Sequence, residues 1–138
     1  MRIVDRLVLD TDVTSFLFNQ DPIRGPRYRA QTDGRTLYLP FIVVAEMLFG
    51  ADVRGWGSDR RAELQEFLGR YAIVESDPDI CGVWATIRAD AQRRGRPIER
   101  QDAWIAAVAL SMNLPLVTHN ARHFAGVPLL RIVSEPDR

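Results

Sequence analysis

The segment Leu7-Val8-Leu9-Asp10-Thr11-Asp12 decides the fold, because it is a short apolar run that ends in acidic residues. Such a run is typical of a buried β-strand. A stretch with helical spacing, Thr11–Phe18, follows it directly, and short apolar runs alternate with helical stretches along the rest of the chain. This alternation predicts an α/β fold, a three-layer α/β/α sandwich in which helices cover both faces of a central parallel sheet. Ligands of such folds gather beyond the carboxyl ends of the strands.

The remaining elements are assigned from apolar spacing and from breaker residues, and together they predict one domain over residues 1–138 without repeats or linkers. The predicted strands are Leu7–Asp10, Thr36–Leu39, Ala72–Val74, Leu116–Thr118 and Leu129–Val133. The predicted helices are Thr11–Phe18, Asp21–Thr32, Phe41–Asp52, Arg60–Tyr71, Pro78–Arg94 and Arg100–Asn113.

Composition excludes several classes of protein. The net charge is +0, from 18 basic and 18 acidic residues, which disfavours a general polyanion-coating protein. Every one of the basic residues is arginine, a pattern that composition bias explains but that also removes any mechanism requiring lysine. A single cysteine excludes a disulfide framework. No signal peptide is visible and no apolar run approaches the ~20 residues of a membrane span, so we expect a cytoplasmic protein with no membrane partner.

Three carboxylates occupy positions that packing alone does not favour. Asp10 ends the first strand, Glu46 interrupts an apolar helix that we expect to be buried on all sides, and Asp102 opens another apolar helix. Each has an ordinary explanation: a helix cap for Asp10 and Asp102, and an ion pair with an arginine for Glu46. Because all three share this kind of placement, we predict that they converge in one pocket, with carboxylates roughly 4–8 Å apart.

Clustered carboxylates repel one another, and a hard divalent cation relieves that repulsion. Oxygen ligands and retained water favour Mg²⁺ or Mn²⁺. Asp12, Thr118 and Asn120 also lie at strand ends and could bind a cation or orient a carboxylate. The two histidines, His119 and His123, fall short of the ligands that a zinc site needs.

At this point the chain resembles the PIN-domain family, and more narrowly the VapC toxins of bacterial toxin–antitoxin modules. The resemblance covers nearly the whole chain and is carried by four motifs. They are Leu9-Asp10-Thr11-Asp12-Val13, Val44-Ala45-Glu46, Asp102-Ala103-Trp104-Ile105-Ala106-Ala107 and Leu116-Val117-Thr118-His119-Asn120-Ala121-Arg122-His123-Phe124.

The resemblance implies an RNase H-like fold and a metal-dependent endoribonuclease, the toxin of a type II toxin–antitoxin system. Such an enzyme would cleave tRNA, rRNA or mRNA, inhibit translation and be neutralised by a VapB-type antitoxin. Carried over, Asp10, Glu46 and Asp102 are the acidic metal-site residues. Many members have a further Asp before the phenylalanine of the last motif, and here that position is His123. Because one acid is replaced, we expect weak metal binding in the absence of RNA.

Three alternatives remain at this stage. Asp10, Asp12 and Thr14 also match the D-x-D-x-T motif of haloacid dehalogenase-like phosphatases, which normally need a lysine that this chain lacks. The replaced acid would suit a non-catalytic binding module with a PIN fold. A metal-free ribonuclease could use His119 or His123 as general acid or base.

Partner binding is also expected from apolar residues. We predict a homodimer, or a hetero-oligomer with the antitoxin, formed through apolar grooves. The residues that suggest such grooves are Phe16, Leu17, Phe18, Leu64, Phe67 and Leu68.

Overall fold

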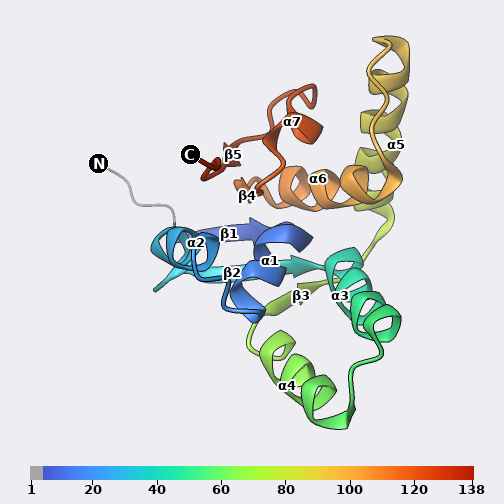
Figure 1. Ribbon diagram of the computed structural model, residues 1–138. Coiled ribbons are helices and arrows are strands. Elements are labelled where there is room, and N and C mark those ends of the chain that lie inside the picture. Colours follow the sequence, from blue (N-terminus) through green and yellow to red (C-terminus); the bar gives the residue numbers. More distant parts are fainter. Residues whose placement is uncertain (1–4) are drawn as a thin grey trace.

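The computed structural model describes residues 5–138 and confirms the α/β class, so residues 1–4 of the predicted domain lie outside the described residues (Figure 1). The strands are β1 (Arg6–Leu9), β2 (Thr36–Pro40), β3 (Ala72–Val74), β4 (Leu116–Val117) and β5 (Ile132–Val133). The helices are α1 (Thr11–Phe18), α2 (Arg24–Thr32), α3 (Phe41–Arg54), α4 (Ser58–Leu68), α5 (Pro78–Arg93), α6 (Arg100–Met112) and α7 (Ala121–Phe124).

The five strands form one parallel sheet in the order β3-β2-β1-β4-β5, flanked by helices as predicted. β1 lies at the centre, where Val8 pairs with Tyr38 of β2 and Leu9 pairs with Val117 of β4. A strand covered on both faces must be apolar throughout, which explains why Leu7, Val8 and Leu9 are all buried. After β1 the chain adds β2 and β3 on one side of β1, and it later adds β4 and β5 on the other side. In open parallel sheets this reversal opens a crevice at the carboxyl ends of the two strands.

Element boundaries differ from the prediction for local reasons. α2 begins at Arg24 rather than at Asp21. The Asp21 carboxylate accepts hydrogen bonds from the backbone N–H groups of Ile23 and Arg24, so Asp21 precedes the helix and caps its start. The last strand is only Ile132–Val133, since Leu129 has a positive φ of 68° and is 92% exposed. The short helix α7 has too few residues to show a period in sequence.

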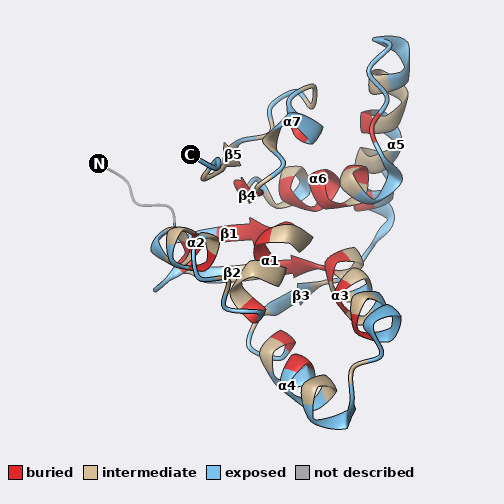
Figure 2. Cartoon of the chain, viewed as in Figure 1, coloured by how far each residue is buried: buried red, intermediate tan, exposed pale blue. Residues whose placement is uncertain are grey.

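Helix α3 is amphipathic, and the expectation that it is buried on all sides is wrong. Val43, Met47 and Ala51 are buried at a spacing of four residues, whereas Phe49 and Val53 are each 68% exposed. Figure 2 shows buried and exposed residues along the same helix. One face of α3 therefore packs on the sheet and the other presents apolar side chains to the surface. None of the helices within residues 5–138 combines the length and hydropathy that a membrane crossing requires.

Of the six residues expected to form partner grooves, three belong to the buried core of this chain and three pack against that core while staying partly exposed. Phe18, Leu64 and Leu68 are buried, and Phe16, Leu17 and Phe67 are half-buried against the same cluster. Phe18 packs edge-on against Phe67, with ring centroids 5.2 Å apart, so α4 closes over the end of α1. The groove prediction is therefore wrong for Phe18, Leu64 and Leu68, because a helical stripe of apolar residues looks the same whether it faces a core or a partner. For Phe16, Leu17 and Phe67, contact with a partner stays a prediction.

Candidate active site

A pocket of about 370 Å³ opens beyond the carboxyl ends of β1 and β4, and we call it the acidic pocket. It brings together the three carboxylates predicted to converge, and all of the accessory residues except Thr118 line it as well. The lining residues are Asp10, Thr11, Asp12, Ser15, Glu46, Glu99, Gln101, Asp102, Asn120 and His123.

Asp10 is the most buried acid of the pocket, with 6% of its surface exposed. Its Oδ1 accepts a hydrogen bond of 2.7 Å from the Thr11 backbone N–H, so it also caps α1. Its Oδ2 accepts a hydrogen bond of 2.7 Å from the hydroxyl of Thr118, which follows β4. Thr118 is fully buried behind Asp10 and accepts a bond of 3.1 Å from the Asn120 N–H. Thr118 therefore orients Asp10 rather than facing the pocket.

Asp12 holds the loop after β4 in place. Its Oδ1 accepts a hydrogen bond of 2.7 Å from the Val13 N–H, and its Oδ2 accepts one of 3.1 Å from the His119 N–H. The bond to the His119 N–H holds the loop that follows β4 against α1. It thereby also holds Asn120, the next residue, at the pocket beside Asp12.

Glu46 projects from α3 into the acidic pocket and forms no ion pair among the described side chains. Its Oε1 is buried, and the hydroxyl of the neighbouring Thr11 offsets part of the rise that burial causes in the pKa of Glu46, but these two buried oxygens do not meet in a well-formed hydrogen bond. A buried carboxylate oxygen without a partner is costly unless a cation satisfies it. The alternative explanation, an ion pair with arginine, is therefore not what the structure shows.

Burial and repulsion between carboxylates raise the pKa values of four acids of the pocket. Burial raises the pKa of Asp10 from 3.8 to about 7, with a further rise from the Asp12 charge. Burial is also the largest cause of the raised pKa values of Asp12, Glu46 and Asp102. A nearby cation would reverse these shifts, because it favours the charged form of each carboxylate.

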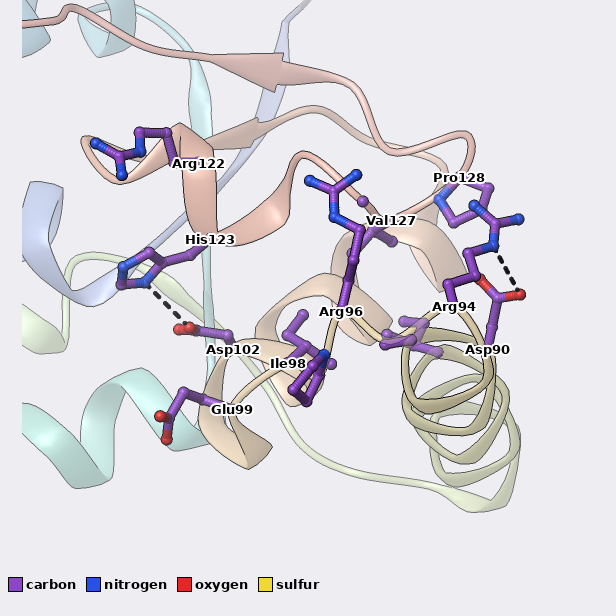
Figure 3. Close-up of a pocket in the computed structure, with 14 residues that line it drawn as sticks. Asp90, Arg94, Arg96, Ile98, Glu99, Asp102, Arg122, His123, Val127 and Pro128 are labelled. Atoms are coloured by element: carbon purple, nitrogen blue, oxygen red, sulfur yellow. Dashed lines mark ion pairs between the residues drawn. The ribbon is translucent and has the colours of Figure 1, made fainter.

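His123 faces the acidic pocket, where it pairs with Asp102 (Figure 3). Its Nδ1 lies 3.3 Å from Asp102 Oδ2, and this contact offsets part of the rise that burial causes in the pKa of Asp102. His123 stands where the resemblance leads us to expect an acid, so a basic group occupies the place of a carboxylate at the edge of the pocket.

His119 belongs to a different cluster. Its Nδ1 lies 2.7 Å from the Tyr28 hydroxyl, and its Nε2 lies 3.2 Å from Asp137, which also pairs with Arg24. The ring does not line the acidic pocket. The two histidines therefore do not share one ligand, which argues against a zinc site between them, and only His123 lies where a metal-free ribonuclease could use it in the acidic pocket.

Sequence reasoning missed four residues that line the pocket: Thr11, Ser15, Glu99 and Gln101. Glu99 directly precedes α6 without a side-chain capping hydrogen bond, and its charge contributes to the raised pKa of Asp102. An acid three residues before Asp102 was a visible signal. The sequence could not show, however, that the residue before a helix would turn toward the carboxylates.

The donor chemistry of the acidic pocket fits a hard divalent cation. Its charged oxygen donors are carboxylates, which suit Mg²⁺ and Mn²⁺. The Glu46 Oε1, which accepts no well-formed hydrogen bond, has lone pairs free for such a cation. Across residues 5–138, no three His, Cys, Asp or Glu side chains form a ready-made metal-binding group. Mg²⁺ is commonly held by one or two carboxylates together with water and substrate phosphate, which this arrangement allows.

Comparison with known proteins places this fold and pocket in a family. Residues 7–128 match the sequence model of the PIN domain. The chain therefore belongs to the PIN-domain family, whose ribonucleases generally depend on a divalent metal.

The particular relatives are ribonucleases. Ribonuclease VapC1 of Haemophilus influenzae (strain R2866) is 32% identical, over 85% of this chain and 88% of the relative. The tRNA(fMet)-specific endonuclease VapC of Shigella flexneri is 28% identical, over 91% of this chain and 95% of the relative. The structure of VapBC-1 from nontypeable Haemophilus influenzae superposes with a TM-score of 0.76 at 26% identity, over 94% of this chain and 97% of that chain. Within its family the chain is thus a VapC-type endoribonuclease.

The dehalogenase-like alternative fails on both family and geometry. Residues 7–128 match the PIN domain, the chain has no lysine to hold the phosphate, and both oxygens of Asp12 already accept backbone hydrogen bonds. Thr14 is fully buried, and its hydroxyl donates a 2.8 Å hydrogen bond to the backbone oxygen of Asp10. Thr14 is therefore a structural residue of α1.

Proposed function

We propose that this chain is the toxin of a toxin–antitoxin pair and hydrolyses RNA phosphodiester bonds at the acidic pocket. The observation that carries the proposal is the convergence of Asp10, Glu46 and Asp102 in one pocket, with a buried Glu46 oxygen left unsatisfied. These three residues would hold Mg²⁺ or Mn²⁺. When bound, the ion supplies an activated water and relieves charge on the phosphate and the leaving oxygen.

The other residues of the pocket prepare this site. Thr118 holds Asp10 in one orientation, and Asp12 holds the loop that carries Asn120. His123 keeps Asp102 oriented at the pocket edge through the 3.3 Å contact. The proposed substrate is RNA, as in the relatives named ribonucleases, and the tRNA(fMet)-specific relative makes tRNA the first class to test.

A VapB-type antitoxin is the proposed partner, and a surface groove supports this. A groove of about 470 Å³ shares Thr11, Ser15 and Glu46 with the acidic pocket and extends along the exposed apolar face of α3. Phe49 and Val53 line it. A partner helix with apolar residues on one face could lie there and place a cationic side chain near Glu46.

Removal of the metal is the direct test of this function. We expect purified protein to cleave total RNA in Mg²⁺ or Mn²⁺ and to lose all cleavage in excess EDTA, because the carboxylates alone cannot activate water. Sequencing of the new RNA ends would identify the target. Undiminished cleavage in EDTA would favour a histidine mechanism, and absence of cleavage with either metal would favour a binding module.

The replacement His123→Asp tests the consequence of the altered acid. We expect it to tighten Mn²⁺ binding at least about tenfold, or about 1.4 kcal/mol, because it exchanges a basic group beside Asp102 for a carboxylate. Isothermal titration calorimetry without RNA measures the affinity.

The matched control is His123→Asn, which removes the contact with Asp102 but adds no charge. If both variants tighten binding equally, the gain comes from releasing Asp102 and not from an added carboxylate. Equal affinity in wild type and His123→Asp would place position 123 outside the metal site.

A further inference from the structure

A second cavity adjoins the acidic pocket. It measures about 350 Å³ and lies between the end of α5, the loop before α6, and α7 with the turn that follows it (Figure 3). Glu99, Asp102 and His123 line both spaces. A ligand in this second cavity would therefore lie directly beside the carboxylates. We call it the arginine cavity, because Arg94, Arg96 and Arg122 line it.

Two of the three arginines have no partner within the described chain. Arg94 pairs with Asp90 at 3.3 Å, at the end of the cavity away from Asp102 (Figure 3). In residues 5–138, the guanidinium groups of Arg96 and Arg122 make neither an ion pair nor a hydrogen bond. Both groups are thus available, and a guanidinium is well suited to bidentate binding of a phosphate.

Gly126 keeps the space beside Arg96 open. A Cβ atom at position 126 would lie 3.7 Å from the guanidinium carbon of Arg96. A longer side chain there would therefore occupy the space in which a ligand could meet this arginine.

The floor of the cavity is apolar. Ile87 and Ile98 are buried beneath it, and Val127 and Pro97 line its wall. An arginine plane can lie against the face of a base, and the apolar floor can cover the rest of that face, although none of the described residues that line this cavity is Phe, Tyr or Trp. The volume is at the lower end of the range of about 300–1,000 Å³ that is typical of ligand pockets, so the cavity suits a single small unit.

We propose that the arginine cavity binds one nucleotide of the RNA strand next to the bond that is cut, with Arg96 on its phosphate oxygens and Arg122, whose guanidinium points away from Arg96 (Figure 3), on the adjacent phosphate of the strand. This inference rests on the proposed function. A chain with a net charge of +0 and an acidic reaction pocket has no overall attraction for a polyanion, so local arginines must hold the strand. The shared residues Glu99, Asp102 and His123 place those arginines immediately beside the reaction site.

The test is RNA binding in the Asp10→Asn background, which prevents cleavage during the measurement. Fluorescence anisotropy with a labelled single-stranded RNA is recorded across a range of salt concentrations. We expect Arg96→Ala and Arg122→Ala each to weaken binding about tenfold. Each should also lower the slope of log affinity against log salt by about 0.7, the value for one phosphate contact on a single strand.

Two further variants make the result specific. Gly126→Asp leaves both arginines in place but sets a carboxylate beside Arg96, and it should weaken RNA binding as Arg96→Ala does. Arg70→Ala removes an exposed arginine that pairs with Glu66 near the end of α4, and it should leave the affinity and the salt slope unchanged. Arg96 and Arg122 are themselves exposed, so their loss should not unfold the chain.

The outcomes separate this inference from the proposed function. If wild-type protein cleaves RNA and the three cavity variants bind like Arg70→Ala, the inference is overturned and the function stands. If wild-type protein neither cleaves nor binds RNA, both fail. Weakened antitoxin binding with unchanged RNA binding would also overturn the inference, because the cavity would then receive an acidic protein segment.

Discussion

Replacing Asp10 by asparagine is expected to reduce RNA cleavage by about three orders of magnitude or more. Asp10 is the acid held most firmly in the pocket, by the Thr11 N–H on one oxygen and the Thr118 hydroxyl on the other. An amide keeps the shape of the side chain but removes the charge that attracts a cation. Losing several kcal/mol of charge stabilisation corresponds to a rate change of this size.

The measurement is initial cleavage rate on a defined RNA in saturating Mg²⁺ or Mn²⁺. Asp59→Asn is the matched control, because Asp59 is an exposed acid in the first turn of α4, which packs over the end of α1 and not at the pocket. Its rate should equal that of the wild type. Full activity of Asp10→Asn would remove Asp10 from the metal site.

The same replacement is expected to stabilise the metal-free fold at alkaline pH. Folding raises the pKa of Asp10 from 3.8 to about 7, mainly because burial disfavours the charged form. The stabilising contribution of this group is complete below pH 4 and is lost as the pH rises through about 7. One pKa unit is worth about 1.4 kcal/mol, so the upper limit of the loss is about 4 kcal/mol. Asparagine carries no charge at any of these pH values and avoids the loss.

Urea unfolding in EDTA at pH 5 and pH 8 checks this expectation. The gain of Asp10→Asn over wild type should be about a third of its full size at pH 5, because pH 5 already lies above the ordinary pKa of 3.8, and should reach a few kcal/mol at pH 8. Added Mn²⁺ at pH 8 should stabilise the wild type and not the variant, since only the wild type binds the ion.

Asp21→Asn supplies a control of opposite sign. Backbone hydrogen bonds from Arg24 and Ile23 lower the pKa of Asp21, so its stabilising contribution is present above its ordinary pKa of 3.8. The Asp21→Asn protein should therefore be less stable than wild type at pH 8.

A wild type more stable than Asp10→Asn at pH 8 in EDTA would contradict the assignment of Asp10 as a buried, cation-requiring acid.

The elements of this fold could be predicted where a pattern was long enough to read. The central strand was visible because Leu7, Val8 and Leu9 are buried on both faces and therefore uniformly apolar. Helix α7 was missed because four residues cannot display a period. The apolar sequence of α3 suggested burial all round, yet Phe49 and Val53 are exposed. Composition alone does not tell a core face from a partner face.

The candidate site could be predicted only in part. Asp10, Glu46 and Asp102 stood out individually because each was an acid in an unfavourable place. The pairing of His123 with Asp102 and the turn of Glu99 into the pocket depend on tertiary contacts that no local pattern encodes. The arginine cavity could not be predicted either. All 18 basic residues of the chain are arginines, so nothing in the sequence distinguishes the three that line the cavity.

The central place of β1 in the sheet has a consequence for how the enzyme becomes active during folding. The Thr118–Asp10 hydrogen bond spans 108 positions of the chain, so it closes one of the longest loops that the fold contains. Contacts of such high sequence separation are slow to form, because their closure entropy must be overcome first. A partly folded chain with β1, β2 and β3 in place would hold Asp10 and Glu46 but would lack Thr118 and the helix that carries Asp102. Catalytic competence would then arrive with the docking of β4 on β1, which gives a nascent toxin a latent period before it can cut RNA.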